Sequence, residues 1–295
     1  MKRVAMVKTF MRPDIFKSCM NFLISAKTDV VLVAFDGPQE YWDEHRKIVF
    51  EANQYIDAEI FRFPYDCGLS ACRNRLIEMI SEPYFLMIDD DVGVVSNIWD
   101  ALSVMQINKN LAAATFGWLE SNMFYNIDAW DINIKSEGVL SKKINWPKQI
   151  INVNGFVFSF PFDFVPNQGF WSRRFFDEFH WDEHYIIEAE HEDLALQAKP
   201  SKWGFAVCLN VFLCHMHDRD DNVYNRNHRF SEEKMAKSWC YFFRKWNLKE
   251  YRDAETLFPY ISPTIIERPE TVRESLEKWS RLSPSPAQMK MREKQ

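Results

Sequence analysis

The chain is poor in glycine and has no long uncharged apolar segment. Only 8 of its 295 residues are glycine, which excludes a collagen-like protein and a glycine-rich linker. No window holds about 18 uncharged apolar residues, so the sequence predicts no membrane span. The apolar stretch near the N-terminus is interrupted by Lys8 and Arg12 and is too short for the core of a signal peptide. We therefore expect a soluble, cytoplasmic protein.

Metal-ribbon and thiol-redox motifs are also missing. The six cysteines stand at positions 19, 67, 72, 208, 214 and 240, and no two of them have C-x-x-C spacing. Six scattered cysteines in a chain of this length indicate buried free thiols in a reducing compartment rather than a disulfide framework. The net charge is −6, from 36 Lys+Arg against 42 Asp+Glu, which argues against nucleic-acid binding by bulk charge alone.

What the sequence does contain is enough apolar material, 47% of its residues, for one large domain or two small ones. The first hundred residues alternate apolar runs with amphipathic stretches. Strands buried on both faces and alternating with helices indicate a parallel sheet with right-handed crossovers. We expect strands at 4–10, 30–35, 58–63 and 84–88, with helices from residue 13 and over 42–53 and 70–80.

The rest of the chain is less regular. Residues 119–154 show no clear period, and 151–165 read as strands with a hairpin at Asn154-Gly155. The four prolines after residue 262 predict a loosely packed tail. We further expect strands at 111–118 and 205–213, helices at 172–179 and 190–198, and an amphipathic helical region at 226–252.

The strongest functional signal is segment 84–94, YFLMIDDDVGV, in which an apolar strand ends in Asp89, Asp90 and Asp91. Ligands of open α/β sheets bind outside the carboxyl ends of the strands. Three adjacent carboxylates repel one another unless a cation lies among them. Carboxylate oxygens suit Mg²⁺ or Mn²⁺ held jointly with substrate phosphates. We predict such a site here, with a solvated acidic turn as the alternative.

A second signal is segment 66–78, DCGLSACRNRLIE. Ser70 is expected to cap a helix that begins near Ala71, which places Arg73 in its first turn. A helix N-terminus combined with a guanidinium favours a diphosphate or a nucleoside. The alternative is an exposed arginine on an ordinary helix.

Two further segments carry candidate groups. Glu188, Glu190, Glu192 and Asp193 crowd six residues, and crowded carboxylates beside a pocket can act as a general base near neutral pH. The alternative is an acidic helix start favoured by the helix dipole.

A late strand ends in His215-x-His217, and alternate residues of a strand face the same way. One of these histidines is expected to bind Mn²⁺ while the other is structural. The alternative is a pair of surface or hydrogen-bonded histidines.

Together these motifs resemble the GT-A glycosyltransferases, over roughly residues 3–220. The resemblance is greatest to the family 2-like inverting enzymes, including the β-1,4-N-acetylgalactosaminyltransferase type. It rests on the order of strand and Arg-Pro, strand and Asp-Gly-Pro, G-L-S-A-x-R-N, strand and D-D-D, E-D, and a late histidine. Cys72 departs from the small residue more usual at its position. The E-D segment also lacks the glycines often found before it, and Asn167–Trp171 are expected to do the work of that loop.

The resemblance implies an α/β fold with a GT-A Rossmann-like, mostly parallel sheet, helices on both faces and a helical C-terminal extension. It divides the chain into a catalytic domain at 1–220, with a nucleotide-sugar half at 1–118 and an acceptor half at 119–220, and an extension at 221–295.

The resemblance also implies roles for single residues. The nucleotide-sugar would be bound by Thr9, Phe10, Arg12, Asp36, Arg73, Asp89 and Asp90. The metal, Mn²⁺ or Mg²⁺, would be held by Asp91 and His215, with His217 in reserve. Asp193 would be the catalytic base, with Glu192 beside it, and Phe170 or Trp171 would stack on a sugar face.

The implied reaction moves a sugar from a nucleotide-sugar donor, a UDP-sugar by resemblance, to an acceptor hydroxyl with inversion. The acceptor stays open between a glycan, a lipid-linked sugar and a hydroxymethylated base of viral DNA. Residues 226–252 carry eight basic and three acidic residues interleaved with aromatics, and could meet an anionic surface. Snorkelling lysines and arginines on a core-covering helix are the alternative.

Three other functions stay open beside this one. They are a nucleotidyltransferase, a non-catalytic sugar-binding module and a metal-dependent hydrolase. A nucleotidyltransferase usually needs a glycine-rich loop after its first strand, and the segment at that place, KTFMRPD, contains no glycine.

Overall fold

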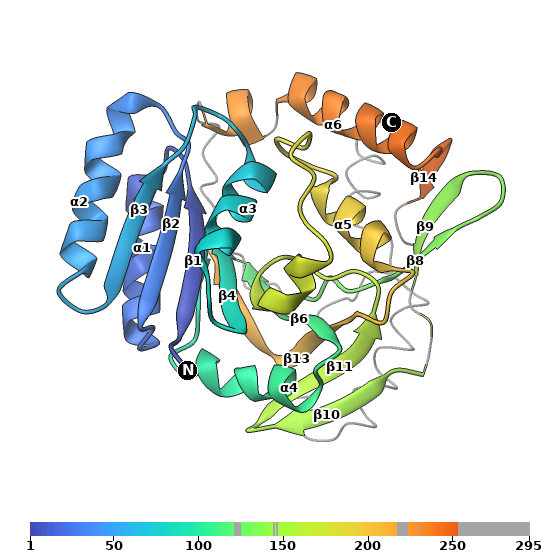
Figure 1. Ribbon diagram of the computed structural model, residues 1–295, viewed down its shortest axis with the longest axis horizontal. Helices are drawn as coiled ribbons and strands as arrows, with labels where there is room; N and C mark the ends of the chain where they lie inside the picture. The colour runs from blue at the N-terminus through green and yellow to red at the C-terminus, as the bar shows by residue number, and fades with distance from the viewer. Residues whose placement is uncertain (121–124, 144, 146, 217–223, 230, 253–295) are drawn as a thin grey trace.

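The structure is a computed structural model that describes residues 1–120, 125–143, 145, 147–216, 224–229 and 231–252 (Figure 1). Its first part alternates strands and helices, as the sequence predicts. The four strands pair in parallel in the order β4-β1-β2-β3, which confirms the expected parallel sheet. The elements are β1 (Val4–Thr9), α1 (Pro13–Ser25), β2 (Val30–Phe35), η1 (Gln39–Tyr41), α2 (Trp42–Ala52), β3 (Asp57–Arg62), α3 (Leu69–Met79) and β4 (Tyr84–Asp89).

The second part of the chain extends the same sheet. Its order continues from β4 through β12, β6, β13 and β11 to β10, with β5 pairing β13 and β7 pairing β6. The elements are β5 (Val92–Gly93), η2 (Ile98–Leu102), α4 (Ser103–Ile107), β6 (Leu111–Glu120), β7 (Tyr125–Asn126), β8 (Asp131–Ile134), β9 (Val139–Lys143), β10 (Gln149–Val153), β11 (Phe156–Phe162), β12 (Gly169–Ser172), η3 (Arg173–Asp177), α5 (Glu190–Ala198), β13 (Gly204–His215), η4 (Asn225–Arg229), α6 (Glu232–Lys245) and β14 (Glu250–Arg252).

Three expectations for this part need comment. The hairpin at Asn154-Gly155 is confirmed, because Val153 pairs with Phe156. The helix expected at 172–179 is a short 3₁₀ turn, η3, and the segment without a clear period contains strands β7 to β10. The tail after residue 262 lies outside the described residues.

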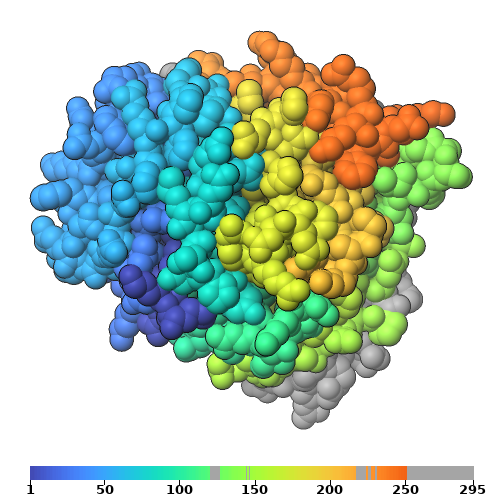
Figure 2. Space-filling view, in the orientation of Figure 1, coloured from blue at the N-terminus to red at the C-terminus, as the bar shows by residue number. Residues whose placement is uncertain are grey.

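Strand β12 is the one that joins the two parts. It runs antiparallel between β4 and β6, with Gly169 opposite Met87 on one side and Thr115 on the other. A Cβ at Gly169 would lie 2.4 Å from the carbonyl oxygen of Ala114, so β12 approaches β6 this closely only because this residue is glycine. One sheet therefore runs through both parts of the chain. In Figure 2 their side chains meet without a break on the face shown.

Helices cover both faces of the sheet because the strands are apolar on both faces. Ala5, Val7 and Val33 share a core with α1, α2 and α4, whereas the alternate residues Met6 and Leu32 share one with α3 and α5. This arrangement confirms the α/β, mostly parallel fold with helices on both faces.

A smaller sheet and α6 lie at one side of the molecule. Strands β14, β9 and β8 form this sheet, and Trp130, Ile132 and Leu140 pack with Phe242 of α6 in a third core. Figure 1 shows α6 running across the end of the molecule near α5. Within the described residues, no helix combines the length and apolarity that crossing a bilayer requires.

Candidate active site

The candidate site lies where β1, β2 and β4 end, because parallel strands bring their carboxyl ends to one edge. Two clefts meet at this edge. The first cleft encloses about 600 Å³ and is lined by Lys8, Thr9, Phe10, Arg12, Asp66, Gly68, Leu69, Asp89, Asp90, Ile186, Ile187, Tyr224, His228, Arg229 and Lys234. The second cleft encloses about 980 Å³ and is lined by Leu69, Arg73, Asp89, Asp91, Trp118, Asp128, Lys142, Phe164, Gln168, Ile187, Glu188, Ala189, Glu190, His191, Glu192, His215 and Arg229.

Arg12 holds two of the three aspartates. Its guanidinium donates to Asp91 at 2.8 Å and also pairs with Asp90, and all three side chains are buried. The Thr9 hydroxyl donates to Asp90 at 2.8 Å. Burial raises the pKa of the Asp90 carboxyl, and Arg12 only partly offsets that rise. The Arg12 guanidinium thus supplies part of the positive charge that the adjacent carboxylates need because they repel one another.

Asp89 is held by groups from distant parts of the chain. Arg73 of α3 donates to it at 3.0 Å and Gln168 donates at 2.6 Å, while the backbone N–H of Asp89 donates to the Gln168 side chain. Burial alone would raise the pKa of Asp89, but Arg73 and Gln168 hold it below its ordinary value. Asp89 lines both clefts and therefore marks their junction.

Asp91 and His215 both line the second cleft and lie close together. The Met216 N–H donates to the Asp91 carbonyl oxygen, which brings the end of β13 against the aspartates. His215 Nε2 then lies 3.7 Å from Asp91 Oδ2. Burial favours a raised pKa for Asp91, but His215 and Arg12 hold it well below its ordinary value.

The divalent-cation site predicted at Asp91 and His215 stays a prediction. One carboxylate oxygen and one imidazole nitrogen at this spacing suit Mn²⁺. Two protein ligands leave positions for substrate phosphates, as is common for such ions. Arg229 NH1, 3.6 Å from Asp91, adds a second positive group. His217 lies outside the described residues, so its predicted role stays a prediction.

The segment before α5 delivers polar side chains to the second cleft. Glu188 and Ala189 both have left-handed backbones, with φ of 68° and 64°, which is a strained conformation for non-glycine residues. Glu190 Oε1 lies 3.0 Å from His191 Nε2 and 3.5 Å from Arg73 NH1. Lys142 of β9 donates to Glu192 at 2.8 Å.

Asp193, the predicted base, lines neither cleft. It is fully buried, and its carboxylate accepts hydrogen bonds from the side chains of Tyr185, Gln197, Lys245 and Trp246. The last two belong to the end of α6 and the residue after it. This placement makes Asp193 the anchor that holds α6 against α5.

The structure separates the residues predicted to bind nucleotide into two groups. Thr9, Phe10, Arg12, Asp89 and Asp90 line the first cleft. Rings of Tyr65, Tyr224 and His228 lie within about 6 Å of the Phe10 ring, so this cleft has an aromatic wall.

Asp36 and Arg73 do not line the first cleft. Asp36 is fully buried behind it and pairs with Lys8 at 2.9 Å. Arg73 lies in the second cleft, with its guanidinium 5.1 Å from the Trp181 ring centre.

The expected cap of helix α3 and the expected sugar-stacking aromatics are both wrong. Helix α3 begins at Leu69 after Gly68, so Ser70 is not its cap. Phe170 and Trp171 are buried in the cores on either side of β12, where neither can stack on a sugar. Their neighbour Asn167 does serve the site: with its amide oxygen turned toward them, it accepts from Arg73 and His191.

Four of the eight basic residues in segment 226–252 contact carboxylates within the chain. Lys234 contacts Asp66, Lys237 contacts Glu233 at 2.6 Å, and Lys245 contacts Asp182 at 2.7 Å. Arg229 is partly exposed, and its NH1 atom lies 3.6 Å from Asp91 Oδ2. The segment thus contributes to the clefts and to the docking of α6, and its role as an anionic-surface site stays a prediction.

Sequence reasoning gave no site role to Lys142 or Tyr224, and it placed Lys234 only in the basic segment 226–252. Lys142 meets Glu192 across 50 positions of sequence, within a segment that showed no period. Tyr224 lies over the Arg12 guanidinium, 4.6 Å from it, although nothing local in the sequence sets it apart from other aromatics.

No family model and no curated protein sequence matches the chain. Solved structures do: S. aureus TarS 1-349, a GT-A-type glycosyltransferase, superposes with a TM-score of 0.53 at 12% identity over 73% of this chain. The complex of TarS 1-349 with UDP-GlcNAc gives a TM-score of 0.53 at 11% identity over 75% of this chain. The chain has a GT-A-like fold. It spans 60% of the length of TarS 1-349 in both comparisons.

Proposed function

We propose that this protein is a glycosyltransferase that moves a sugar from a nucleotide-sugar donor, a UDP-sugar, to an acceptor hydroxyl. The observation that carries the proposal is the cluster of Asp89, Asp91 and His215 at the junction of two clefts, on the carboxyl edge of a GT-A-like sheet. A neighbour with this fold, TarS 1-349, has been solved with UDP and with UDP-GlcNAc.

The two clefts divide the substrates between them. The first cleft, with the Phe10, Tyr224 and His228 rings, takes the nucleobase and ribose, because planar bases stack on aromatic faces. Lys8, Lys234 and Arg229 line the same cleft and favour an anionic ligand. The second cleft takes the sugar and the acceptor.

Asp91 and His215 would hold the divalent cation at the junction. When bound, such an ion neutralises the diphosphate and stabilises the leaving nucleoside diphosphate. Arg12 donates to Asp91 Oδ2, the same oxygen that His215 approaches, and keeps this carboxylate ionised. Arg73 and Gln168 fix Asp89 in the same way, so the acidic edge is set before substrate arrives.

The acceptor proton goes to His191 in this proposal. Its Nε2 faces Glu190 at 3.0 Å, so an N–H there donates to the carboxylate and leaves Nδ1 as the acceptor of the neutral ring. The ring lines the second cleft, as Glu192 does. Glu192 is the rival base, but its carboxylate is engaged by Lys142. Asp193 is a positioning residue.

A single displacement with such a base inverts the anomeric carbon. The acceptor stays a prediction: a glycan, a lipid-linked sugar or a hydroxymethylated DNA base, each of which offers a hydroxyl.

The test is a thermal-shift panel of UDP, GDP, CMP and TDP, each with and without Mn²⁺. A ligand that binds only the folded chain must raise its unfolding temperature by mass action. We expect a rise for UDP that depends on Mn²⁺ and disappears in Asp91→Ala and His215→Ala. Asp57→Ala, an exposed carboxylate at the opposite end of the sheet, is the matched control and should keep the rise. No rise for any nucleotide with metal would overturn the proposal.

A further inference from the structure

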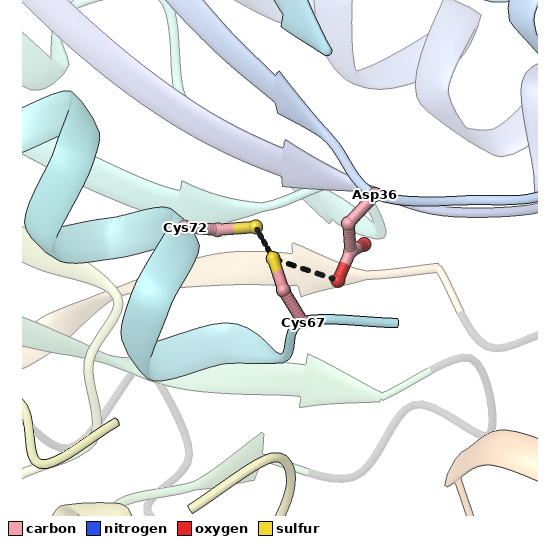
Figure 3. A group of neighbouring side chains, drawn as sticks. All are labelled: Asp36, Cys67 and Cys72. Atoms are coloured by element: carbon pink, nitrogen blue, oxygen red, sulfur yellow. Dashed lines mark hydrogen bonds between the residues drawn. The ribbon is translucent and has the colours of Figure 1, made fainter. Parts of the chain in front are cut away.

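Two cysteines and an aspartate lie together behind the first cleft, apart from the Asp91–His215 pair. Asp36 follows β2, Cys67 lies in the loop before α3, and Cys72 lies in the first turn of α3 (Figure 3). Figure 3 shows both sulfurs and the carboxylate pointing toward one another. Their ligand atoms all lie within 4.8 Å of one another, the one such group of three among the described residues.

The spacing of these atoms suits a metal ion with tetrahedral coordination. Zinc binds sulfur at about 2.3 Å and carboxylate oxygen at about 2.1 Å. The edges of such a tetrahedron are then about 3.8 Å between two sulfurs and about 3.6 Å between sulfur and oxygen. The observed distances are 3.5 Å between the Cys67 and Cys72 sulfurs and 3.8 Å from Cys67 Sγ to Asp36 Oδ2. Small side-chain rotations would complete the geometry.

The surrounding charge also suits a dication. Two thiolates and one carboxylate carry three negative charges, which one Zn²⁺ reduces to one. The ammonium group of Lys8, 2.9 Å from Asp36 Oδ1, balances the remainder. Thiolate ligands favour zinc over magnesium or calcium, which prefer oxygen.

The ligands are held in place and can be reached. Asp36 and Cys72 are fully buried, and the Gly68 N–H donates to Asp36 Oδ2 at 3.0 Å, which leaves that oxygen another lone pair. Cys67 is only half-buried, so an ion can enter from its side.

We propose that Asp36, Cys67 and Cys72 bind one Zn²⁺ ion, with the fourth position taken by water. Two Zn–S bonds and one Zn–O bond form, the two thiol protons pass to solvent, and nothing is oxidised or reduced. The ion ties β2 to the loop that carries Asp66 and Gly68, both of which line the first cleft. It would thus act as a clamp on the wall of that cleft.

The test is a Co²⁺ titration of the full chain, which is first stripped of metal with chelator, reduced with a phosphine and separated from both reagents. Cobalt bound by thiolates gives an intense charge-transfer absorption that oxygen and nitrogen ligands do not give, so the Asp91–His215 pair stays silent. We expect one equivalent of Co²⁺ to produce the band and one of Zn²⁺ to abolish it. Cys67→Ser should remove the band, whereas Cys240→Ser, which alters an exposed cysteine on α6, should keep it.

Two results would overturn the proposal. One is the absence of the band in the wild-type chain, or its persistence in Cys67→Ser when circular dichroism shows both proteins folded. The other is a disulfide between Cys67 and Cys72, located by peptide mapping of the unreduced, denatured protein. A bound Zn²⁺ should also raise the unfolding temperature of the wild type and not of Cys67→Ser. Neither readout depends on glycosyltransferase activity.

Discussion

At the scale of single residues, substitution of Asp193 distinguishes a structural role from a catalytic one. Its buried carboxylate accepts from Tyr185, Lys245 and Trp246, so an amide in its place removes the negative charge that faces Lys245 and replaces one acceptor oxygen with a donor. We expect Asp193→Asn to lower the free energy of unfolding by about 2–4 kcal/mol. Urea unfolding followed by tryptophan fluorescence measures this.

The control is Asp177→Asn, an exposed carboxylate paired with Arg173 at 2.8 Å, which should cost less than about 1 kcal/mol. If Asp193→Asn keeps its stability but loses its activity, then Asp193 is the base and the assignment to His191 is wrong.

His191 and Glu192 as the base predict activity that rises with pH in two different pH ranges. Burial would lower the pKa of His191, but the charge of Glu190, with that of Glu192, raises it above the ordinary histidine value despite Arg73 nearby. Burial would raise the pKa of Glu192, but Lys142 holds it below the ordinary value. A base must be deprotonated, so with His191 as the base kcat/KM should rise with pH through a pKa above 6.5.

The matched variants are His191→Gln and Glu192→Gln. We expect His191→Gln to lower kcat about 10²–10⁴-fold and to remove the acid limb of the profile. A profile that is already flat above pH 5, lost in Glu192→Gln alone, would assign the base to the carboxylate instead.

At the scale of elements, the loop before α3 depends on a glycine. Gly68 has φ of +95°, and a Cβ there would lie 2.6 Å from Ile186 Cα. Gly68→Ala should therefore cost about 2–4 kcal/mol of unfolding free energy, from strain and from the displaced backbone. Gly155 has φ of +86° with no atom within 4 Å of such a Cβ, so Gly155→Ala should cost only about 1 kcal/mol. Equal costs in chemical denaturation would contradict the close-approach argument.

The accuracy of the element predictions follows from how local their signals are. Strands such as Val30–Phe35 are continuous apolar runs ended by Asp-Gly-Pro, and they lie where expected. The start of α3 was misplaced because Ser70 is a common cap, while the decisive fact is a contact between Gly68 and Ile186. Strands β8 and β9 were missed because four or five residues with polar and charged members show little alternation.

Residues of the candidate site can likewise be predicted only where their signal is local in the sequence. The three aspartates were found because they adjoin one another in sequence, whereas their partners Arg12 and Gln168 lie almost 80 positions away on either side. The sequence does not single out His191 among the carboxylates around it, because only the fold shows which side chains of α5 face the cleft and which, like Asp193, face α6.

At the scale of the whole molecule, the sheet runs through both predicted halves. Strands β12 and β6 stand between β4 and β13, so a boundary at residue 118 cuts through β6 and does not separate two sheets. We expect the full chain to unfold in urea with one midpoint, which is the same by far-ultraviolet circular dichroism and by tryptophan fluorescence. Two different midpoints would show that the two halves unfold independently.

The insertion of β12 beside β4 also has a consequence for synthesis. Strand β4 ends at Asp89, and the strand that covers its free edge begins about 80 residues later, at Gly169. At about 5–20 residues per second, the ribosome leaves that edge uncovered for about 4–16 s. During this interval the nascent chain presents a buried-type strand, YFLMID, with open backbone donors and acceptors. The nascent protein is therefore most exposed to aggregation, and most in need of a chaperone, before residue 172 emerges.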